Sequence, residues 1–93
     1  MTITILTQES CAFCGQAQAL LERLKDTFEF EVQTLEFNSP EGERLAMAGG
    51  LMFPPGILID GRPFSYGRLS EGRLRRELAA RAVQTQPATR RIA

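Results

Sequence analysis

The sequence predicts a single α/β domain whose four-stranded mixed sheet is flanked by helices, in the order β-α-β-α-β-β-α. A chain of 93 residues, 43% hydrophobic and 24% charged, has the size and composition of one small globular domain. Strand-like and helix-like stretches alternate along it, and strand–helix–strand crossovers place parallel strands side by side. An Asp-Gly dipeptide at 60–61 predicts a tight hairpin, which adds an antiparallel strand.

Residues 2–6 predict the first strand, because threonine alternates with apolar residues and most of the side chains are β-branched. From Cys11 to Phe28, apolar and small side chains recur at steps of three and four residues, which places them on one face of a helix. Ser10 is the expected N-cap of this helix, since its hydroxyl can accept from the amides of the first turn.

Residues 28–37 predict the second strand. Their alternation changes phase near 33–34, which we interpret as a bulge. Ser39 followed by Pro40 predicts the start of a second helix, with serine as the cap and proline at the first helical position. The Gly-Gly pair at 49–50 predicts its end.

The apolar run 57–59 predicts the third strand, and residues 62–66 return from the Asp-Gly turn as the fourth. Pro63 indicates an edge strand or the start of a strand, because proline has no N–H to donate to a second neighbour.

Ser70 is the expected cap of a last helix. The residues expected to face inward from this part of the chain are Leu69, Leu74, Leu78 and Ala82. Residues 84–93 have too little apolar content to pack, so we expect a domain over 1–83 followed by a polar, frayed tail.

The two cysteines of the chain, Cys11 and Cys14, lie at the predicted start of the first helix. Two thiols at this spacing can close into a disulfide and reopen. The unpaired amides and the dipole at a helix N-terminus stabilise an anion, which favours the reactive thiolate of Cys11. Cys14 lies one turn further on and can attack the resulting mixed disulfide. We therefore expect Cys11 to attack and Cys14 to resolve.

Further residues give the chain a family resemblance. Cys11-Ala12-Phe13-Cys14 opens a helix, Pro55 precedes an Ile-Leu-Ile strand, and Gly67 follows the hairpin. Over residues 2–82 this combination resembles the glutaredoxin branch of the thioredoxin superfamily. The resemblance implies a thioredoxin-like, glutaredoxin-type fold and a dithiol thiol–disulfide oxidoreductase.

The resemblance also implies that Pro55 is a cis-proline that faces the thiols and exposes the neighbouring backbone for strand-like pairing with a substrate. Pro54 stands where the family usually has Val or Thr. The expected substrate-binding residues are Phe13, Pro54, Pro55, Tyr66 and Gly67. Phe53 fits either the rim of this surface or the core, and Met47 and Met52 are expected to serve packing.

Three departures from the glutaredoxin pattern concern the electron donor. Ala12 replaces the proline between the cysteines, Gln8 replaces a lysine that helps to hold the glutathione carboxylate, and residues 65–70 replace a Gly-Gly motif followed by Asp. Arg68 could supply a substitute positive charge or simply face solvent. We therefore expect no firmly bound cofactor. The expected substrate is a disulfide-containing protein or a small thiol, and the expected donor is glutathione or a reductase.

Other interpretations of the cysteine pair stay open. Both cysteines could be structural residues at a helix start. The domain could be a non-catalytic redox sensor or interaction module that presents its arginine-rich residues 62–81 to an acidic partner. One chain has two cysteines and no histidine, too few ligands for zinc, so a metal or iron–sulfur cluster would have to bridge two chains.

The net charge of zero hides an uneven distribution. Residues 1–61 contain nine acidic and three basic side chains, whereas residues 62–93 contain eight arginines and two glutamates. We expect these halves to compensate each other, with the arginines on a solvated helix face. No aromatic-interleaved basic patch points to nucleic acid. The short N-terminal apolar stretch and the lack of a long apolar run predict a cytoplasmic protein without a membrane partner.

Overall fold

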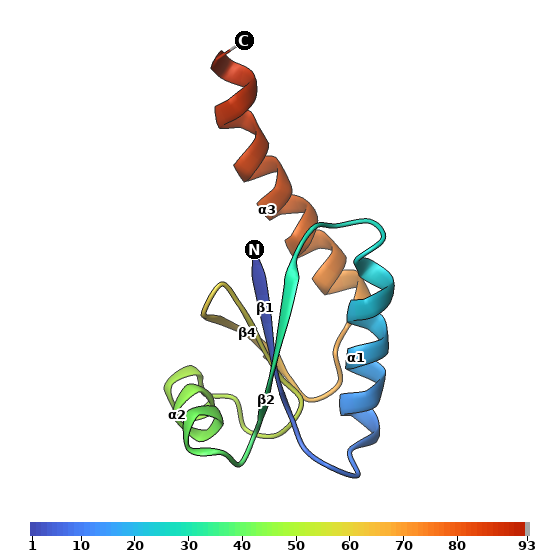
Figure 1. Cartoon of the computed structure of the whole chain (residues 1–93), viewed down its shortest axis with the longest axis vertical. Helices are drawn as coiled ribbons and strands as arrows, with labels where there is room; N and C mark the ends of the chain where they lie inside the picture. Colours follow the sequence, from blue (N-terminus) through green and yellow to red (C-terminus); the bar gives the residue numbers. More distant parts are fainter. Residues whose placement is uncertain (93) are drawn as a thin grey trace.

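A four-stranded mixed sheet with the strand order β2-β1-β3-β4 forms the centre of the computed structural model (Figure 1). The structure describes the backbone of residues 1–92 and the side chains of residues 1–82. The elements follow the predicted order and are β1 (Thr2–Thr7), α1 (Ala12–Leu24), β2 (Glu31–Glu36), α2 (Pro40–Gly49), β3 (Gly56–Ile59), β4 (Arg62–Tyr66) and α3 (Glu71–Ile92). The α/β class is therefore confirmed.

The direction of β3 corrects the expectation that both crossovers join parallel strands. β1 and β2 are parallel, but β3 is antiparallel to β1 and β4 is antiparallel to β3. Helix α2 has only ten residues. Both Glu36, which ends β2, and Gly56, which begins β3, lie at the carboxyl end of β1. The chain has not returned to the opposite end of the sheet when β3 begins, so β3 runs back antiparallel to β1.

The predicted bulge in the second strand is wrong. β2 starts at Glu31 and pairs with β1 residue for residue. Val32 packs against the core on one face of the sheet, whereas Leu35 packs against the core on the other face. The change of phase in the sequence reflects burial on both faces. The irregular pairing occurs instead between β3 and β4, next to Phe64.

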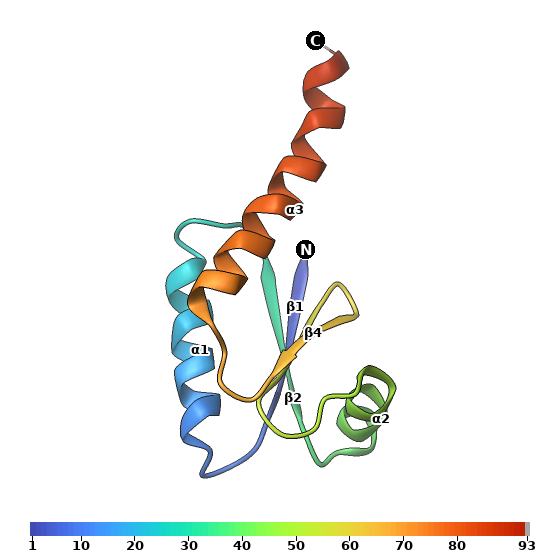
Figure 2. The ribbon, with the colours of Figure 1, turned by 180° about the vertical axis from the view of Figure 1, so that it is seen from behind.

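Helices cover both faces of the sheet. Figures 1 and 2 show α1 and α3 on one face and α2 on the other. The buried residues between the sheet and α1 and α3 include Ile3, Ile5, Leu21, Leu24, Ile57, Ile59, Leu74 and Leu78. The smaller core under α2 consists of Leu6, Ala46, Leu51 and Leu58. Because both faces of the middle strands are covered, β1 is buried from Ile3 to Thr7, threonines included, and β3 is buried throughout.

The predicted start and stop of α2 and the predicted start of α3 are confirmed. The Ser39 hydroxyl accepts from the Gly42 N–H at 3.0 Å, and Gly50 ends α2 in the left-handed conformation. The Ser70 hydroxyl accepts from the Arg73 N–H at 3.2 Å. These side chains satisfy amides that a helix start leaves without intrahelical partners.

The last helix continues to Ile92, beyond the predicted domain boundary at 83. Leu74 and Leu78 are fully buried, as expected. The side chains of residues 84–93 lie outside the described part of the chain. The expectation that these residues form a frayed tail therefore stays a prediction.

Replacing Ser65 with alanine is expected to raise the free energy of unfolding by about 1 kcal/mol, because the buried Ser65 Oγ has no hydrogen-bond partner within the described structure. Ser39→Ala is the matched control, and we expect it to lower the free energy of unfolding. The Ser39 hydroxyl accepts from Gly42 and donates to the Glu36 carbonyl oxygen at 2.7 Å. Its loss should cost about 1 kcal/mol. Urea unfolding measures both changes, and equal destabilisation by the two substitutions would contradict the expectation.

Candidate active site at the carboxyl end of β1

Three loops meet at the carboxyl end of β1, where residues singled out in the sequence are brought together (Figure 1). Residues 8–11 connect this end to α1. Gly56 pairs with Leu6 of β1 and with Tyr66 of β4, so the loop before β3 and the loop after β4 lie at the same end. The fold therefore places the cysteine pair, the Pro-Pro pair and Gly67 at one end of the sheet.

The cysteines form a disulfide within the chain, with their Cα atoms 5.2 Å apart. The two side chains differ in exposure. Cys11 is half-buried, whereas Cys14 lies inside the first turn of α1 and is 3% exposed. A molecule arriving from solvent can therefore reach the Cys11 sulfur before the Cys14 sulfur to which it is bonded.

The N-cap of α1 is Cys11, which corrects the assignment of Ser10. Cys11 has an extended backbone, and its Sγ accepts from the Cys14 N–H at 3.1 Å. Ser10 has a φ of 58°, in the left-handed region. The sulfur thus occupies the position in which a cap oxygen usually satisfies the first-turn amides. After reduction, the same amide and the helix dipole would stabilise negative charge on this sulfur.

The Pro54–Pro55 peptide bond is cis, in agreement with the resemblance. Pro55 is fully buried, and its carbonyl oxygen accepts from the Gly67 N–H at 2.9 Å. Gly67 has a φ of 76°, and a Cβ at this position would lie 2.8 Å from a ring carbon of Phe53. Glycine at 67 therefore lets the loop after β4 close onto the loop before β3.

Phe53 and Tyr66 form an exposed aromatic pair beside this contact. Their ring centroids are 5.0 Å apart in an edge-to-face arrangement. Phe53 is 53% exposed and Tyr66 is 41% exposed, so Phe53 belongs to the rim rather than to the core. Phe13, on the first turn of α1, is also exposed. These rings offer apolar surface near the thiols.

The expectation that Met47 and Met52 serve packing is wrong. They are 83% and 72% exposed. Helix α2 turns Ala46 towards the sheet and Met47 away from it, and Leu51 takes the buried position before β3. The helical register that buries one residue exposes its neighbour.

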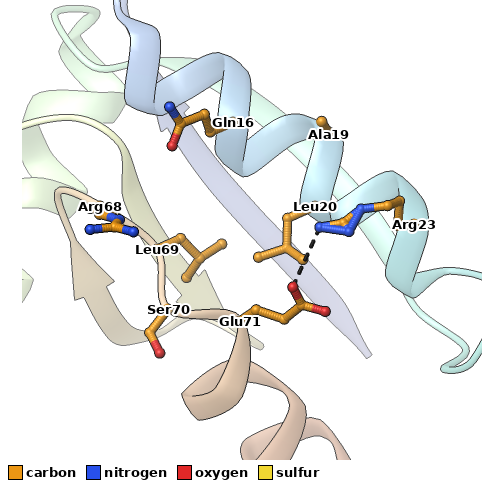
Figure 3. A pocket seen from close by; sticks show the side chains of 8 residues that line it. All are labelled: Gln16, Ala19, Leu20, Arg23, Arg68, Leu69, Ser70 and Glu71. Atoms are coloured by element: carbon orange, nitrogen blue, oxygen red, sulfur yellow. Dashed lines mark hydrogen bonds and ion pairs between the residues drawn. The ribbon is translucent and has the colours of Figure 1, made fainter.

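A cleft of about 730 Å³ lies between α1 and the loop after β4 (Figure 3). Its walls are formed by Gln16, Ala19, Leu20, Arg23, Arg68, Leu69, Ser70 and Glu71. Arg23 pairs with Glu71 at 3.5 Å, whereas Arg68 makes no ion pair among the described side chains. The α1 residues of this wall were not predicted, although their spacing of three and four residues indicates a common helical stripe.

The described residues contain no group of three or more His, Cys, Asp or Glu side chains placed to hold a metal ion. A metal shared between two chains stays a hypothesis. No helix in this part of the chain combines the length and the apolar character needed to cross a membrane.

Comparison with known proteins gives relatives of similar length. No protein-family profile matches the chain. An uncharacterized protein of Mycobacterium bovis and two of Mycobacterium tuberculosis strains are 28% identical to it over 90 residues. The match covers 91% of this chain and 90% of each relative. The similarity thus extends over nearly the whole length of both proteins.

Proposed function

We propose that the protein is a thiol–disulfide oxidoreductase with a thioredoxin-like, glutaredoxin-type fold. One observation carries the proposal: a half-buried Cys11 caps a helix and is bonded to a buried Cys14 one turn later. The β-α-β-α-β-β-α order and the cis Pro54–Pro55 bond at the same end of the sheet support the same conclusion.

The first step uses the Cys11 thiolate of the reduced protein. It attacks one sulfur of a substrate disulfide, so a Cys11–substrate bond forms and the substrate sulfur–sulfur bond breaks. The leaving thiolate takes a proton from water. The Cys14 amide, which donates to Cys11 Sγ, stabilises the attacking charge.

The second step uses Cys14. Its thiol loses a proton and attacks Cys11 Sγ, which forms the Cys11–Cys14 disulfide and releases the second substrate thiolate to be protonated. The substrate has then gained two electrons and two protons. A dithiol reductase or two glutathione molecules must return them to the protein, and no firmly bound cofactor is required.

The exposed rings of Phe13, Phe53 and Tyr66 fit the apolar side chains of an extended substrate beside the Pro-Pro loop. Arg68 in the cleft beside α1 is a candidate to hold the carboxylate of a small thiol such as glutathione. Coupled turnover with glutathione and with a thioredoxin-reductase system identifies the donor. The proposed compartment is the cytoplasm, where paired cysteines are more often catalytic than structural.

Cys14→Ser is expected to trap a mixed disulfide. The reduced variant, mixed with an excess of insulin, should accumulate insulin bonded to Cys11 through a mixed disulfide, because the resolving thiol is missing. Intact mass spectrometry under non-reducing conditions detects the adduct. Wild type should instead end as the internal disulfide, and the variant lacking both cysteines should form no adduct. If Cys14→Ser forms no adduct under conditions in which wild type is oxidised, the role of Cys14 as the resolving residue is wrong.

A further inference from the structure

Strand β4 is an edge of the sheet with backbone groups directed outward. Tyr66 pairs with Gly56, and the neighbouring Gly67 N–H donates to the Pro55 carbonyl. In an antiparallel ladder this places Tyr66 in a non-hydrogen-bonded pair, so its own N–H and C=O point away from β3. Within the described residues, no strand pairs with this side of β4.

A second cleft, of about 420 Å³, follows this edge. It is lined by Gly49, Gly50, Leu51, Pro63, Phe64, Ser65, Tyr66 and Arg73. Its wall includes the end of α2 on one face of the sheet and a residue of α3 on the other. The cleft is therefore open along the edge of β4 and has the position that an added strand would take.

The α3 side of this edge is positively charged. Arg73 lies over the Phe64 ring, 5.0 Å from its centroid. Arg62 pairs with Ile59, whose side chain faces the α1 and α3 core, so Arg62 lies on the same face. Among the described residues neither Arg62 nor Arg73 makes an ion pair, unlike Arg75, which binds Glu71 at 3.0 Å.

The α2 side of the same edge is apolar. Pro63 is in van der Waals range of the end of α2, because a Cβ on Gly49 would lie 2.9 Å from the Pro63 Cβ. Tyr66, on the same face as Pro63, is 41% exposed. A strand added here would place alternate side chains on the two faces. The side chains on one face of the added strand would lie against arginines, and those on the other face would lie against apolar surface.

We propose that the free edge of β4 binds an extended, acidic segment of a partner protein as a fifth strand. Acidic side chains of the segment face Arg62 and Arg73, and the alternate apolar side chains lie over Pro63 and Tyr66. Main-chain hydrogen bonds to the N–H and C=O of Tyr66 provide the pairing, because Pro63 at the other end of the strand has no N–H to donate. The charge complementarity selects the partner.

This docking surface leads towards the cysteines. β4 ends at Tyr66, and the next residue closes onto Pro55 at the carboxyl end of β1. A segment bound along β4 would hold a nearby cysteine of the partner at this end of the sheet. Binding at β4 does not require thiol chemistry, whereas its use in choosing disulfide substrates rests on the proposed function.

A short fluorescent peptide that alternates Glu and Val tests the binding. We expect saturable binding to the full chain, with NMR shift changes at the amides of β4. Arg73→Gln should weaken binding about fivefold or more through the lost charge. The matched control is Arg75→Gln, which removes one charge from the same helix and should leave the affinity unchanged.

Further controls change the peptide and leave the protein sequence unaltered. A Lys-Val peptide of the same alternation should not bind. Of two Glu-Val peptides, one N-methylated at every Glu and the other at every Val, one should lose binding because its methyl groups replace the N–H groups that face β4. Unchanged binding of both N-methylated peptides would overturn strand addition, and shifts confined to β2 would overturn the assigned surface.

The chain itself carries an acidic edge strand, β2, so self-association is a necessary comparison. Pairing of β2 on one copy with β4 on another is a heterologous contact that leaves further edges free and extends into open assemblies. In sedimentation at rising concentration, we expect no self-association that depends on Arg73. If wild type self-associates and Arg73→Gln does not, the proposal of a separate partner is overturned. If the protein binds the Glu-Val peptide but reduces no disulfide substrate in a separate assay, the proposed function is contradicted. The proposal that β4 is a docking surface then still stands.

Discussion

Cys11→Ser is expected to lower the rate of disulfide reduction by on the order of a thousandfold or more. A serine hydroxyl is not ionised near neutral pH, whereas a cysteine thiol at a helix N-terminus readily becomes the attacking thiolate. The structure places Cys11 Sγ where the Cys14 amide donates to it and where solvent can reach it. Turnover of insulin, coupled to whichever donor supports wild type, measures the effect.

The matched variant is Cys14→Ser, which keeps the attacking sulfur. Its first attack on a substrate disulfide, followed in a single turnover, should proceed at a rate within about tenfold of wild type, because the amide of residue 14 is retained. Both variants should have similar unfolding curves under reducing conditions. A Cys11→Ser protein with wild-type turnover would show that another group attacks.

Gly42→Ala is expected to lower the free energy of unfolding by about 2 kcal/mol or more. In an ordinary helix the same substitution is stabilising by up to about 1 kcal/mol, since alanine is the better helix former. Here an added Cβ would overlap the carbonyl oxygen of Glu36 and lie 3.0 Å from the carbonyl oxygen of Phe37. Backbone atoms at the end of β2 cannot move aside as a side chain can, so the first turn of α2 must shift.

Gly72→Ala is the control for Gly42→Ala. Gly72 is an exposed residue near the start of α3, and the nearest atom to an added Cβ is an Arg76 guanidinium nitrogen at 3.7 Å. This substitution should raise the stability by about 0.5 kcal/mol. For a domain of this size, 2 kcal/mol corresponds to roughly 10 °C in Tm. Thermal unfolding of the two variants should therefore show shifts of opposite sign, and equal shifts would contradict the role of the Glu36 contact.

Local sequence signals predicted much of the fold because their causes are local. The helix starts at Ser39 and Ser70, the stop at Gly50 and the turn at 60–61 depend on a few neighbouring residues. Asp60 and Gly61 both have positive φ, as a tight hairpin turn requires. Of the candidate site, the cysteine pair and the Pro-Pro loop could be named from the sequence.

Long-range packing decided the features that the sequence patterns did not predict. Periodicity indicates which residues are buried but not from which side, so the burial of Val32 and Leu35 on opposite faces produces the same change of phase as a bulge. The exposure of Met47 and Met52 depends on how α2 is rotated against the sheet. Both clefts are formed by residues far apart in the chain, and no local spacing brings those residues together.

By itself, the sequence determined the chemistry available to this protein and the kind and order of its elements: two thiols one helical turn apart at a helix start, with β-α-β-α-β-β-α around them. Only the tertiary structure decided the direction of β3, the exposure of Met47 and Met52, and the position of Arg73 beside the edge of β4. The reason is physical. Element type follows from interactions within a few residues, whereas strand direction, side-chain exposure and edge accessibility depend on which distant surfaces are buried together.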